Sequence, residues 1–421
     1  MYLGLDFGTS GARACVLDEN NKIVHEDRTA YPHAATQNAD DWRAALYHLL
    51  LGIPEEISSQ IIRIAVDGTS SSVLLCDANL QPISPLLLYH DNRALSQVEF
   101  LNKCAPPGHI ACSATSGLAK FLWLTQNVNL TNVSYFMHQA DWISSILTGI
   151  GGVSDYHNAL KSGYDVENLC WPGWVEQLPN ASLLPNVLAP GQYIATISAS
   201  ASHQFKFNSN CTVHAGTTDS IAAFIAADVN QPGEAVTSLG TTLVLKLLSS
   251  TRVESAEYGV YSHRYGNMWL AGGASNSGAG VLSLYFTNSQ LQELSKQIET
   301  RSSSSLDYYP LAHPGERFPY NDPRLQPRMT PRPNNDVEFL HGLLQGIGKI
   351  EAIGYKRLAE LGASPLTSVS TSGGGAENAT WIKIRACLLN VPVTKARHTE
   401  AAIGAAKLAK LGNITIQSSN I

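Results

Sequence analysis

The stretch Asp6-Phe7-Gly8-Thr9-Ser10-Gly11 decides the fold, because it turns one apolar strand back into another around two glycines. We expect strands on both sides of it, at 2–7 and 12–17, and a third strand from residue 23. The glycines let backbone N–H groups converge on an anion, and the two hydroxyl side chains add donors. The pattern predicts an antiparallel meander whose first turn holds a phosphate. An ordinary surface turn is the alternative, because short glycine motifs match often.

Two charged side chains of this hairpin extend the hypothesis. Mg²⁺ usually keeps several waters and takes few protein ligands, so Asp6 is a candidate for orienting a magnesium-bound water. Arg13 lies on the second strand, where its guanidinium can meet a phosphate. The candidate phosphate-binding residues of the hairpin are Gly8, Thr9, Ser10, Gly11 and Arg13.

A similar hairpin recurs in the second half of the chain. Residues 235–247 are expected to form a strand, a turn and a strand around Ser238-Leu239-Gly240-Thr241-Thr242. Two halves that each begin with such a hairpin suggest a duplicated architecture. Hairpins with a Gly-Thr turn are common, so the repeat is weak evidence when taken alone.

A glycine run, Gly373-Gly374-Gly375, stands between an expected strand at 368–372 and a helix that begins near Asn378. Three glycines before a helix N-terminus permit the close approach of a flat or charged ligand. A structural turn requires one glycine or two. The third glycine therefore favours a binding role.

The motif Gly216-Thr217-Thr218-Asp219 links an expected strand at 211–215 to a helix at 220–227. The dipole of a helix keeps a carboxylate at its N-terminus ionised, and an ionised carboxylate can accept a proton from a hydroxyl group. Asp is also a favoured helix-capping residue. Catalysis and capping both remain open for Asp219 at this point.

The composition bounds the class of protein. A chain of 421 residues is expected to form two domains, and its 44% apolar and 15% charged residues are typical of a globular enzyme. A net charge of −6 provides no basic field for nucleic acid or a membrane surface. The seven scattered cysteines suggest a reducing compartment. With an expected strand starting at Tyr2, we predict a cytoplasmic protein, a trimmed organelle-targeting peptide being the alternative.

Further elements surround these motifs. Seven of the 20 prolines fall in 310–333, which predicts an extended segment without helix. A long helix is expected from Asn335 to Gly362. The other expected elements are strands at 61–67 and 73–77 and helices at 116–126, 140–147 and 400–412.

In this order and at these distances, the motifs resemble those of the FGGY carbohydrate kinases over essentially the whole chain. Residues 4–10 look like the first phosphate loop, 238–242 like the second, and 373–393 like the second family signature. Residues 215–219 occupy the place of the catalytic aspartate. The remaining similar stretches are Asp67-Gly68-Thr69 and Asp91-Asn92-Arg93 of the sugar region, the D-x-x-N-A stretch at 154–159 and the G-E-R-x-P run at 315–319.

The resemblance implies an α/β fold of two RNase-H-like domains of the actin/hexokinase ATPase type, with ATP in a deep interdomain cleft. Residues 1–227 and 400–421 would form the N-terminal, sugar-binding domain. Residues 228–399 would form the C-terminal, adenosine-binding domain.

The resemblance also implies roles for single residues. Asp219 would be the catalytic base, and ATP and Mg²⁺ would be the cofactors. The implied ATP-binding residues of the second half are Gly240, Thr241, Thr242, Gly373, Gly374, Gly375 and Asn378, and the implied substrate-binding residues are Asp6, Ser70, Asp155, Thr218 and Asp219. The partner would be a small sugar, without nucleic acid or membrane, and the chain a monomer or homodimer.

Within the family, residues 67–71, 139–142 and 154–161 look like the cyanobacterial and plant D-ribulose kinases. This similarity predicts conversion of D-ribulose to D-ribulose 5-phosphate. D-xylulose or another pentulose or polyol is the alternative, because Tyr89-His90 and Ser70–Ser72 depart from the pattern of many relatives. Rival hypotheses are an actin- or chaperone-like ATPase switch and an inactive, sugar-sensing relative.

Overall fold

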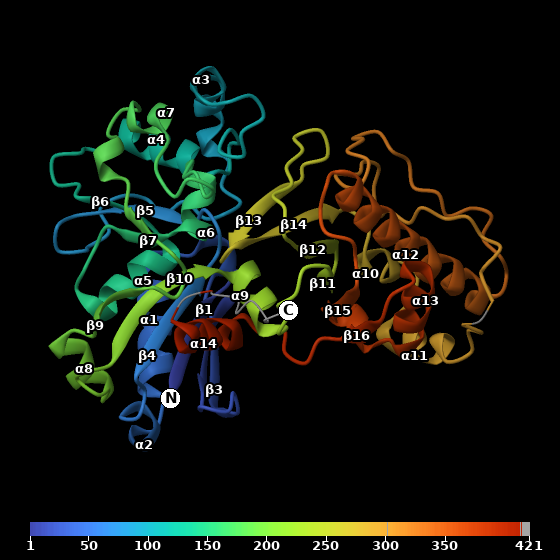
Figure 1. The fold of residues 1–421 in the computed structure, drawn as a ribbon, viewed down its shortest axis with the longest axis horizontal. Coiled ribbons are helices and arrows are strands. Elements are labelled where there is room, and N and C mark those ends of the chain that lie inside the picture. Colours follow the sequence, from blue (N-terminus) through green and yellow to red (C-terminus); the bar gives the residue numbers. More distant parts are fainter. Residues whose placement is uncertain (301, 413, 415–421) are drawn as a thin grey trace. The chain divides into compact units, whose positions relative to one another are not determined.

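A computed structural model describes residues 1–300, 302–412 and 414. They divide into two compact units, Met1–Ala226 with Glu400–Ile421 (unit 1) and Ala227–Thr399 (unit 2). Each unit is an α/β structure built on a six-stranded sheet (Figure 1). The expected α/β fold is confirmed.

The sheet of unit 1 has the strand order β3-β2-β1-β4-β10-β9. Its strands are β1 (Tyr2–Phe7), β2 (Gly11–Leu17), β3 (Ile23–Ala30), β4 (Arg63–Gly68), β9 (Tyr193–Thr196) and β10 (Thr212–Thr218). The first three form the expected antiparallel meander. Strands β1, β4 and β10 are parallel, so their carboxyl ends lie at the same edge.

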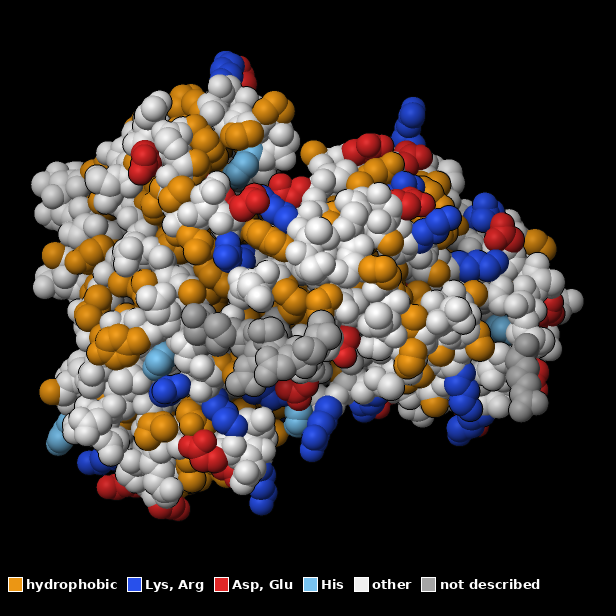
Figure 2. Space-filling model, in the orientation of Figure 1, with side chains coloured by type: hydrophobic (Ala, Val, Ile, Leu, Met, Phe, Trp, Pro, Cys, Tyr) orange, Lys and Arg blue, Asp and Glu red, His pale blue; other side chains and the backbone are white. Residues whose placement is uncertain are grey.

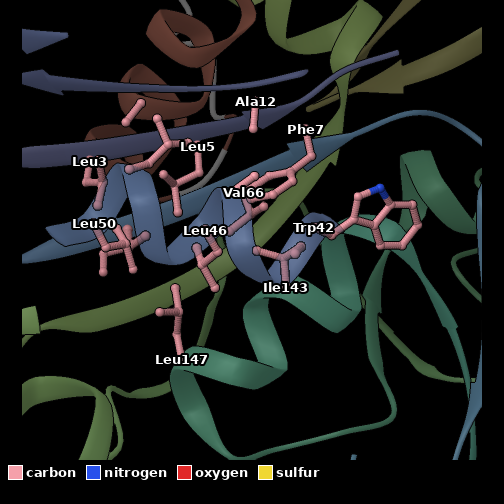
Figure 3. Close-up of a cluster of buried hydrophobic side chains, with 14 of the residues drawn as sticks. Leu3, Leu5, Phe7, Ala12, Trp42, Leu46, Leu50, Val66, Ile143 and Leu147 are labelled. Carbon is pink, nitrogen blue, oxygen red and sulfur yellow. The ribbon is translucent and has the colours of Figure 1, made fainter. Parts of the chain in front are cut away.

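One face of this sheet carries the larger core of unit 1. Side chains alternate across a strand, so Leu3, Leu5 and Phe7 share one face of β1. They pack with α1 (Ala39–Leu51) and α5 (Gln139–Thr148). Figure 3 shows this cluster, with labelled members Leu3, Leu5, Phe7, Ala12, Trp42, Leu46, Leu50, Val66, Ile143 and Leu147.

The opposite face of the sheet is covered by the last helix, α14 (Ala401–Leu411), which packs against β1 and β2 and against α9 (Asp219–Ala226). Glycines permit this close approach. A Cβ at Gly4 would lie 2.0 Å from the carbonyl oxygen of Ala402, and a Cβ at Gly404 would lie 1.8 Å from that of Ala222. Asp6 alternates with Leu5 and Phe7, and it therefore belongs to the α14 face.

A satellite core lies beside this sheet in unit 1. It is formed around β5 (Val73–Cys76), β6 (Tyr135–His138), α3 (Val98–Cys104) and α4 (Gly117–Asn127). Strands β5 and β6 pair with each other outside the main sheet. This core buries Lys120, a charged side chain with no exposed surface.

The sheet of unit 2 has the order β13-β14-β12-β11-β15-β16. Its strands are β11 (Glu234–Leu239), β12 (Leu243–Ser249), β13 (Tyr261–Tyr265), β14 (Met268–Ser275), β15 (Ser368–Ser372) and β16 (Val393–Lys395). As in unit 1, the first two strands form an antiparallel hairpin, here β11 and β12. Strands β15 and β16 then continue the sheet from β11 in parallel. The shared topology supports the duplicated architecture inferred from the two hairpins.

Two helices pack together in unit 2, α12 (Asp336–Glu360) and α13 (Ala379–Leu389). A buried ion pair connects them, because Arg385 donates to both oxygens of Glu351 at 2.5 and 2.6 Å. The same residues reach the sheet. Glu351 accepts from Thr237 of β11 at 2.6 Å, and Arg385 donates to Thr371 of β15 at 2.8 Å.

The remaining elements are short. They are β7 (Val153–Asp155), β8 (Asn186–Leu188), α2 (Glu55–Ser58), α6 (Tyr156–Ala159), α7 (Gly173–Glu176), α8 (Ala199–Phe205), α10 (Ala279–Leu282) and α11 (Asn288–Ser295). Residues 310–333 contain only isolated bridges, which confirms the expected extended segment. No helix in the described part of the chain is long and apolar enough to cross a membrane. On the face drawn in Figure 2, acidic and basic side chains are interspersed.

Some elements differ from the expectations. Strand β10 continues to Thr218 and α9 begins at Asp219, because a register shift between His214 and Thr217 lets the strand run on past Gly216. Helix α1 and strands β13 and β14 were not expected.

Candidate active site

The carboxyl ends of β1, β4 and β10 bring acidic side chains together. Asp6 is paired in register with Asp67, and Asp67 with Thr217. Asp219 follows two residues after Thr217, as the first residue of α9. Three segments far apart in the sequence therefore place Asp6, Asp67 and Asp219 at one edge of the sheet. The sequence pattern had assigned no role of its own to Asp67.

The electrostatics of this acidic cluster are dominated by burial. Burial raises the pKa of Asp6, although the Arg13 guanidinium opposes this shift. Burial, followed by the negative charges of Asp6 and Asp219, raises the pKa of Asp67 well above its usual value. The carboxyl groups of Asp6 and Asp67 lie close enough to share a hydrogen bond when one of them is protonated. Apart from this pair contact, Oδ1 of Asp6 and both oxygens of Asp67 have no hydrogen-bond partner within the described chain. Buried polar atoms of this kind are rare, and they point to a ligand, an ion or water.

Arg13 lies between two carboxylates. Its Nη1 donates to Oδ2 of Asp6 at 2.9 Å, and its Nε lies 3.2 Å from Oε2 of Glu400. Because Asp6 is nearly fully buried, this contact neutralises part of the acidic cluster. The expected contact of Arg13 with a phosphate remains a prediction.

Asp219 is partly exposed at the start of α9. Its Oδ1 accepts a hydrogen bond from the N–H of Ser220 at 2.6 Å. Its position at the positive end of the helix dipole favours the ionised carboxylate. The N–H of Ser220 belongs to the adjacent residue, whereas a capping side chain accepts from the second or third N–H of its helix. Catalysis and capping by Asp219 both stay predictions.

The first hairpin presents main-chain donors to solvent. The N–H of Gly8 donates to the Gly11 carbonyl at 3.0 Å, and Gln37 holds the Thr9 carbonyl at 2.7 Å through its Nε2. The side chains of Thr9 and Ser10 are exposed. Among the described residues, the N–H groups of Thr9 and Ser10 have no internal acceptor. A tight turn with free donors is suited to an anion.

The second hairpin is supported by residues that the sequence pattern did not identify. The N–H of Gly240 donates to the Thr242 carbonyl at 3.2 Å, and Thr241 is exposed. The N–H of Gly280 donates to the Thr241 carbonyl at 3.2 Å. A Cβ at Gly278 or at Gly280 would lie within 2.8 Å of that carbonyl oxygen. The two closely spaced glycines of the run Ser277-Gly278-Ala279-Gly280 are the sequence feature from which this close packing could have been predicted.

The glycine run of unit 2 divides into two kinds of position. Gly373 has φ +81°, and a Cβ there would lie 2.7 Å from the Leu239 carbonyl oxygen. A Cβ at Gly375 would lie 2.7 Å from the Leu239 Cβ. A Cβ at Gly374 would meet nothing within 4 Å. Packing against β11 explains two of the glycines, and the open surface at Gly374 fits the approach of a ligand.

Asn378 has partners inside unit 2. Its Oδ1 caps α13 by accepting from the N–H of Trp381 at 3.0 Å, and its Nδ2 donates to Ser295 Oγ at 2.8 Å. Both ends of the side-chain amide are occupied. The expected contact of Asn378 with a nucleoside therefore stays a prediction, and the observed contacts are structural.

Asp155 also has internal contacts, and its expected contact with the substrate remains a prediction. Its oxygens accept from the N–H of His157 at 2.8 Å and from the N–H and Nδ2 of Asn158 at 3.0 and 2.6 Å. Burial and the nearby Asp141 raise the pKa of Asp155 to about 7. In turn, His157 Nδ1 lies 2.7 Å from Thr217 Oγ1, and Asn158 Nδ2 donates to the Thr217 carbonyl at 3.2 Å. Helix α6 therefore holds the end of β10 beside the acidic cluster.

The predicted sugar-side residues lie at the same edge. Ser70 is partly exposed in the loop that follows β4, and Thr218 pairs in register with Gly68 at the end of β4. Thr218 Oγ1 is buried and has no partner within the described chain. The structure thus brings Ser70 and Thr218 to the acidic cluster.

Two further observations concern ligands. Across residues 1–300, 302–412 and 414, no group of three or more His, Cys, Asp or Glu side chains is arranged to hold a metal ion. The buried, unpartnered Oδ1 of Asp6 fits a contact with Mg²⁺ through water. A cavity of about 350 Å³ lies on the sheet of unit 2, but none of the predicted site residues lines it.

Known proteins are similar to this chain in sequence and in fold. The xylulose kinase of Staphylococcus epidermidis (strain ATCC 12228) is 23% identical over 443 residues, which cover 98% of this chain and 88% of that protein. The crystal structure of the xylulose kinase from Rhodospirillum rubrum superposes with a TM-score of 0.82 at 20% identity, covering 98% of this chain and 89% of that one. The glycerol kinase of Plasmodium falciparum with ADP gives 0.81 at 18% identity, covering 97% and 89%.

These structures share the fold of the chain at low identity. The relatives named above are xylulose and glycerol kinases, so the D-ribulose kinase subgroup stays a prediction. The N-terminal domain of the FGGY family of carbohydrate kinases matches residues 1–226, and its C-terminal domain matches residues 235–412. On these two matches, which together cover nearly the whole chain, the chain belongs to the FGGY family of carbohydrate kinases.

Proposed function

We propose that this chain transfers the γ-phosphate of ATP to a ketopentose, with D-xylulose as the leading candidate and D-ribulose as the second. The observation that carries the proposal is the acidic cluster, with Asp219 at the end of β10 beside Asp67. Membership of a family of ATP-dependent sugar kinases supplies the reaction class.

The two sugars differ in configuration at C3, and different observations favour each. D-xylulose is favoured by the names of relatives that match over nearly the full length of the chain. D-ribulose is favoured by the sequence stretches at 67–71, 139–142 and 154–161. The small side chains of Ser70–Ser72 and the buried, unpartnered Oγ of Ser71 are compatible with either sugar.

In the proposed mechanism, Asp219 is the base. Its carboxylate would accept the proton of the attacking hydroxyl and hold the oxygen in line with the γ-phosphate. Thr218 and Ser70 would contact the sugar at the same edge of the sheet. Helix α6 would keep Asp219 in place through its contacts with Thr217.

The two hairpins would bind the phosphates of ATP. In unit 1, the free N–H groups of Thr9 and Ser10 would donate to phosphate oxygens, and in unit 2 the hairpin at Thr241 would do the same. Gly374 would lie against the nucleoside. Mg²⁺, when bound near Asp6 through water, would offset the negative charge of the phosphates.

A panel of ketopentoses, pentitols and glycerol with ATP tests the proposal. ADP release and the phosphorylated product are both followed for each sugar. The highest kcat/KM for D-xylulose supports the leading candidate, and the highest for D-ribulose supports the second. A clear preference for glycerol or a pentitol would overturn the ketopentose assignment.

A further inference from the structure

Lys120 is a charged side chain enclosed in the satellite core of unit 1, with no exposed surface. It lies on α4 among the apolar side chains that pack around β5. A buried ammonium is costly unless it is fully hydrogen-bonded. Burial lowers the pKa of Lys120 to about 7, with Asp91 and Lys161 as the charged neighbours that act on it.

The three donors of Lys120 go to the main chain of two loops. Nζ donates to the carbonyl of Ser71 at 2.8 Å, and to those of Leu88 and Tyr89 at 2.6 and 3.2 Å. Ser71 lies in the loop between β4 and β5. Leu88 and Tyr89 lie in the segment that leads to Asp91, and this segment pairs with β5 through Leu87 and Val73.

Other contacts join the same two loops. Ser72 Oγ accepts from the N–H of Tyr89 at 3.0 Å and lies 2.6 Å from Thr69 Oγ1. Thr69 is fixed in turn, because its N–H and its Oγ1 both donate to Gln139 Oε1 at 2.8 Å. The loop between β4 and β5 begins directly after Gly68. Gly68 is paired in register with Thr218, the residue before Asp219.

The backbone conformation of the loop between β4 and β5 requires such support. Ser71 has φ +66°, a left-handed backbone that is unfavourable for a residue with a side chain. Such strain persists only where surrounding contacts over-determine it, and it clusters at functional sites. The buried Oγ of Ser71 has no partner within the described chain, while its carbonyl is held by Lys120.

We infer that Lys120 is a positioning residue for the sugar, because it fixes the Ser70–Ser72 loop and the Leu88–Tyr89 segment in the arrangement that meets the acceptor. The inference rests on the proposed function and deepens it. Lys120 does not touch the substrate or ATP itself. It acts through the main chain that carries Ser70 and its neighbours, so its loss affects the binding of the sugar and spares that of ATP.

The test compares Lys120→Met with the wild-type chain, using the ketopentose that the wild type prefers. Loss of three charge-assisted hydrogen bonds is expected to raise the KM for the sugar by about 10- to 100-fold. The KM for ATP is expected to stay within about twofold, because the hairpins at Thr9 and Thr241 are untouched. An unchanged sugar KM, or equal rises in both KM values, would contradict the inference.

Leu101→Ala is the matched control. Leu101 is fully buried in the same satellite core but belongs to α3. This substitution is expected to lower the melting temperature without removing any of the hydrogen bonds that hold the two loops. If Leu101→Ala shifts the sugar KM as much as Lys120→Met does, the role of Lys120 is only structural.

A second variant covers the case in which Lys120→Met fails to fold. Ser72→Ala removes the hydrogen bonds of Ser72 Oγ with Tyr89 and with Thr69, but it leaves the three bonds of Lys120 in place. It is expected to raise the sugar KM in the same direction, and no change would count against the inference. A wild-type chain that phosphorylates no ketopentose would instead overturn the proposed function, so the two failures are distinguishable.

Discussion

At the scale of single residues, Asp219 is the proposed catalytic base, and its two possible roles can be separated by chemistry. Asp219→Asn keeps an oxygen that can accept from Ser220, but it removes the negative charge that would take the proton. We predict that the turnover of Asp219→Asn and Asp219→Ala falls by about 10²–10⁴-fold. ATP binding is expected to persist in both, and calorimetry with ATP measures it.

The capping role makes a different prediction for the same pair. Loss of a cap costs about 0.5–2 kcal/mol of stability, so only Asp219→Ala would melt at a lower temperature and both would turn over normally. Wild-type turnover per folded molecule of Asp219→Asn would remove Asp219 from the mechanism.

Thr9 tests the first hairpin. Thr9→Ala removes an exposed hydroxyl while leaving the main-chain donors of the turn in place. Loss of one charge-assisted donor costs about 1.5–3 kcal/mol, so we predict weaker ATP binding and slower sugar phosphorylation. ATP affinity and basal ATP hydrolysis both equal to wild type would mean that this loop does not hold the phosphates.

Gly374 tests the second unit. A Cβ there meets no protein atom within 4 Å, so Gly374→Ala is expected to leave the melting temperature unchanged. If the nucleoside lies against this surface, the KM for ATP rises by about tenfold, which corresponds to about 1.4 kcal/mol. Gly375→Ala is the contrasting variant, because its Cβ would clash with Leu239 and Trp381 and destabilise the fold. An unchanged KM for ATP in Gly374→Ala would place the nucleoside elsewhere.

At the scale of elements, Asp155, which caps α6, is expected to make the stability of unit 1 depend on pH. The pKa of Asp155 is raised from 3.8 to about 7, so the folded chain binds more protons than the unfolded chain between these values. The stability contributed by this carboxyl is complete below pH 3.8 and is lost as the pH rises through 7. We predict that the wild type loses stability relative to Asp155→Asn between pH 4 and pH 8. A melting-temperature difference that stays constant over this range would contradict the assignment.

Elements with a strong pattern could be predicted from the sequence, and others could not. The apolar meander at the N-terminus and the capped helix α12 follow from local rules, and both are confirmed. Strands β13 and β14 were missed, because polar residues at 261–265 and Gly272 and Gly273 disrupt the apolar alternation. The satellite core was missed for a different reason, since its β5–β6 pairing joins segments about sixty residues apart.

At the scale of the whole molecule, the order of the motifs allowed the family to be predicted, while the site required the register of the strands. Asp67 becomes notable only because β4 lies between β1 and β10, which places it beside Asp6 and Thr217. The Glu351–Arg385 ion pair likewise depends on how α12 and α13 pack in unit 2. Neither contact has a local sequence signal. The two units share an order of five strands, β3-β2-β1-β4-β10 and β14-β12-β11-β15-β16, and differ in the sixth strand at the edge. Each presents a hairpin at the end of its first strand.

The fold of two similar units does not by itself separate a kinase from the rival hypothesis, an ATPase switch. A switch and a kinase share this fold, and they differ in whether ATP consumption requires an acceptor sugar. A kinase must favour the sugar hydroxyl over water as the nucleophile. The dependence of ADP formation on sugar is therefore the property that separates the two classes.

The central claim is tested most directly by measuring ADP and sugar phosphate together, in one reaction of the purified chain with ATP, Mg²⁺ and a ketopentose. We predict that ADP and ketopentose phosphate form in equal amounts, and that omitting the sugar reduces ADP formation to a small basal rate. Equal ADP formation with and without sugar, with no phosphorylated sugar detected, would contradict the assignment of this chain as a ketopentose kinase.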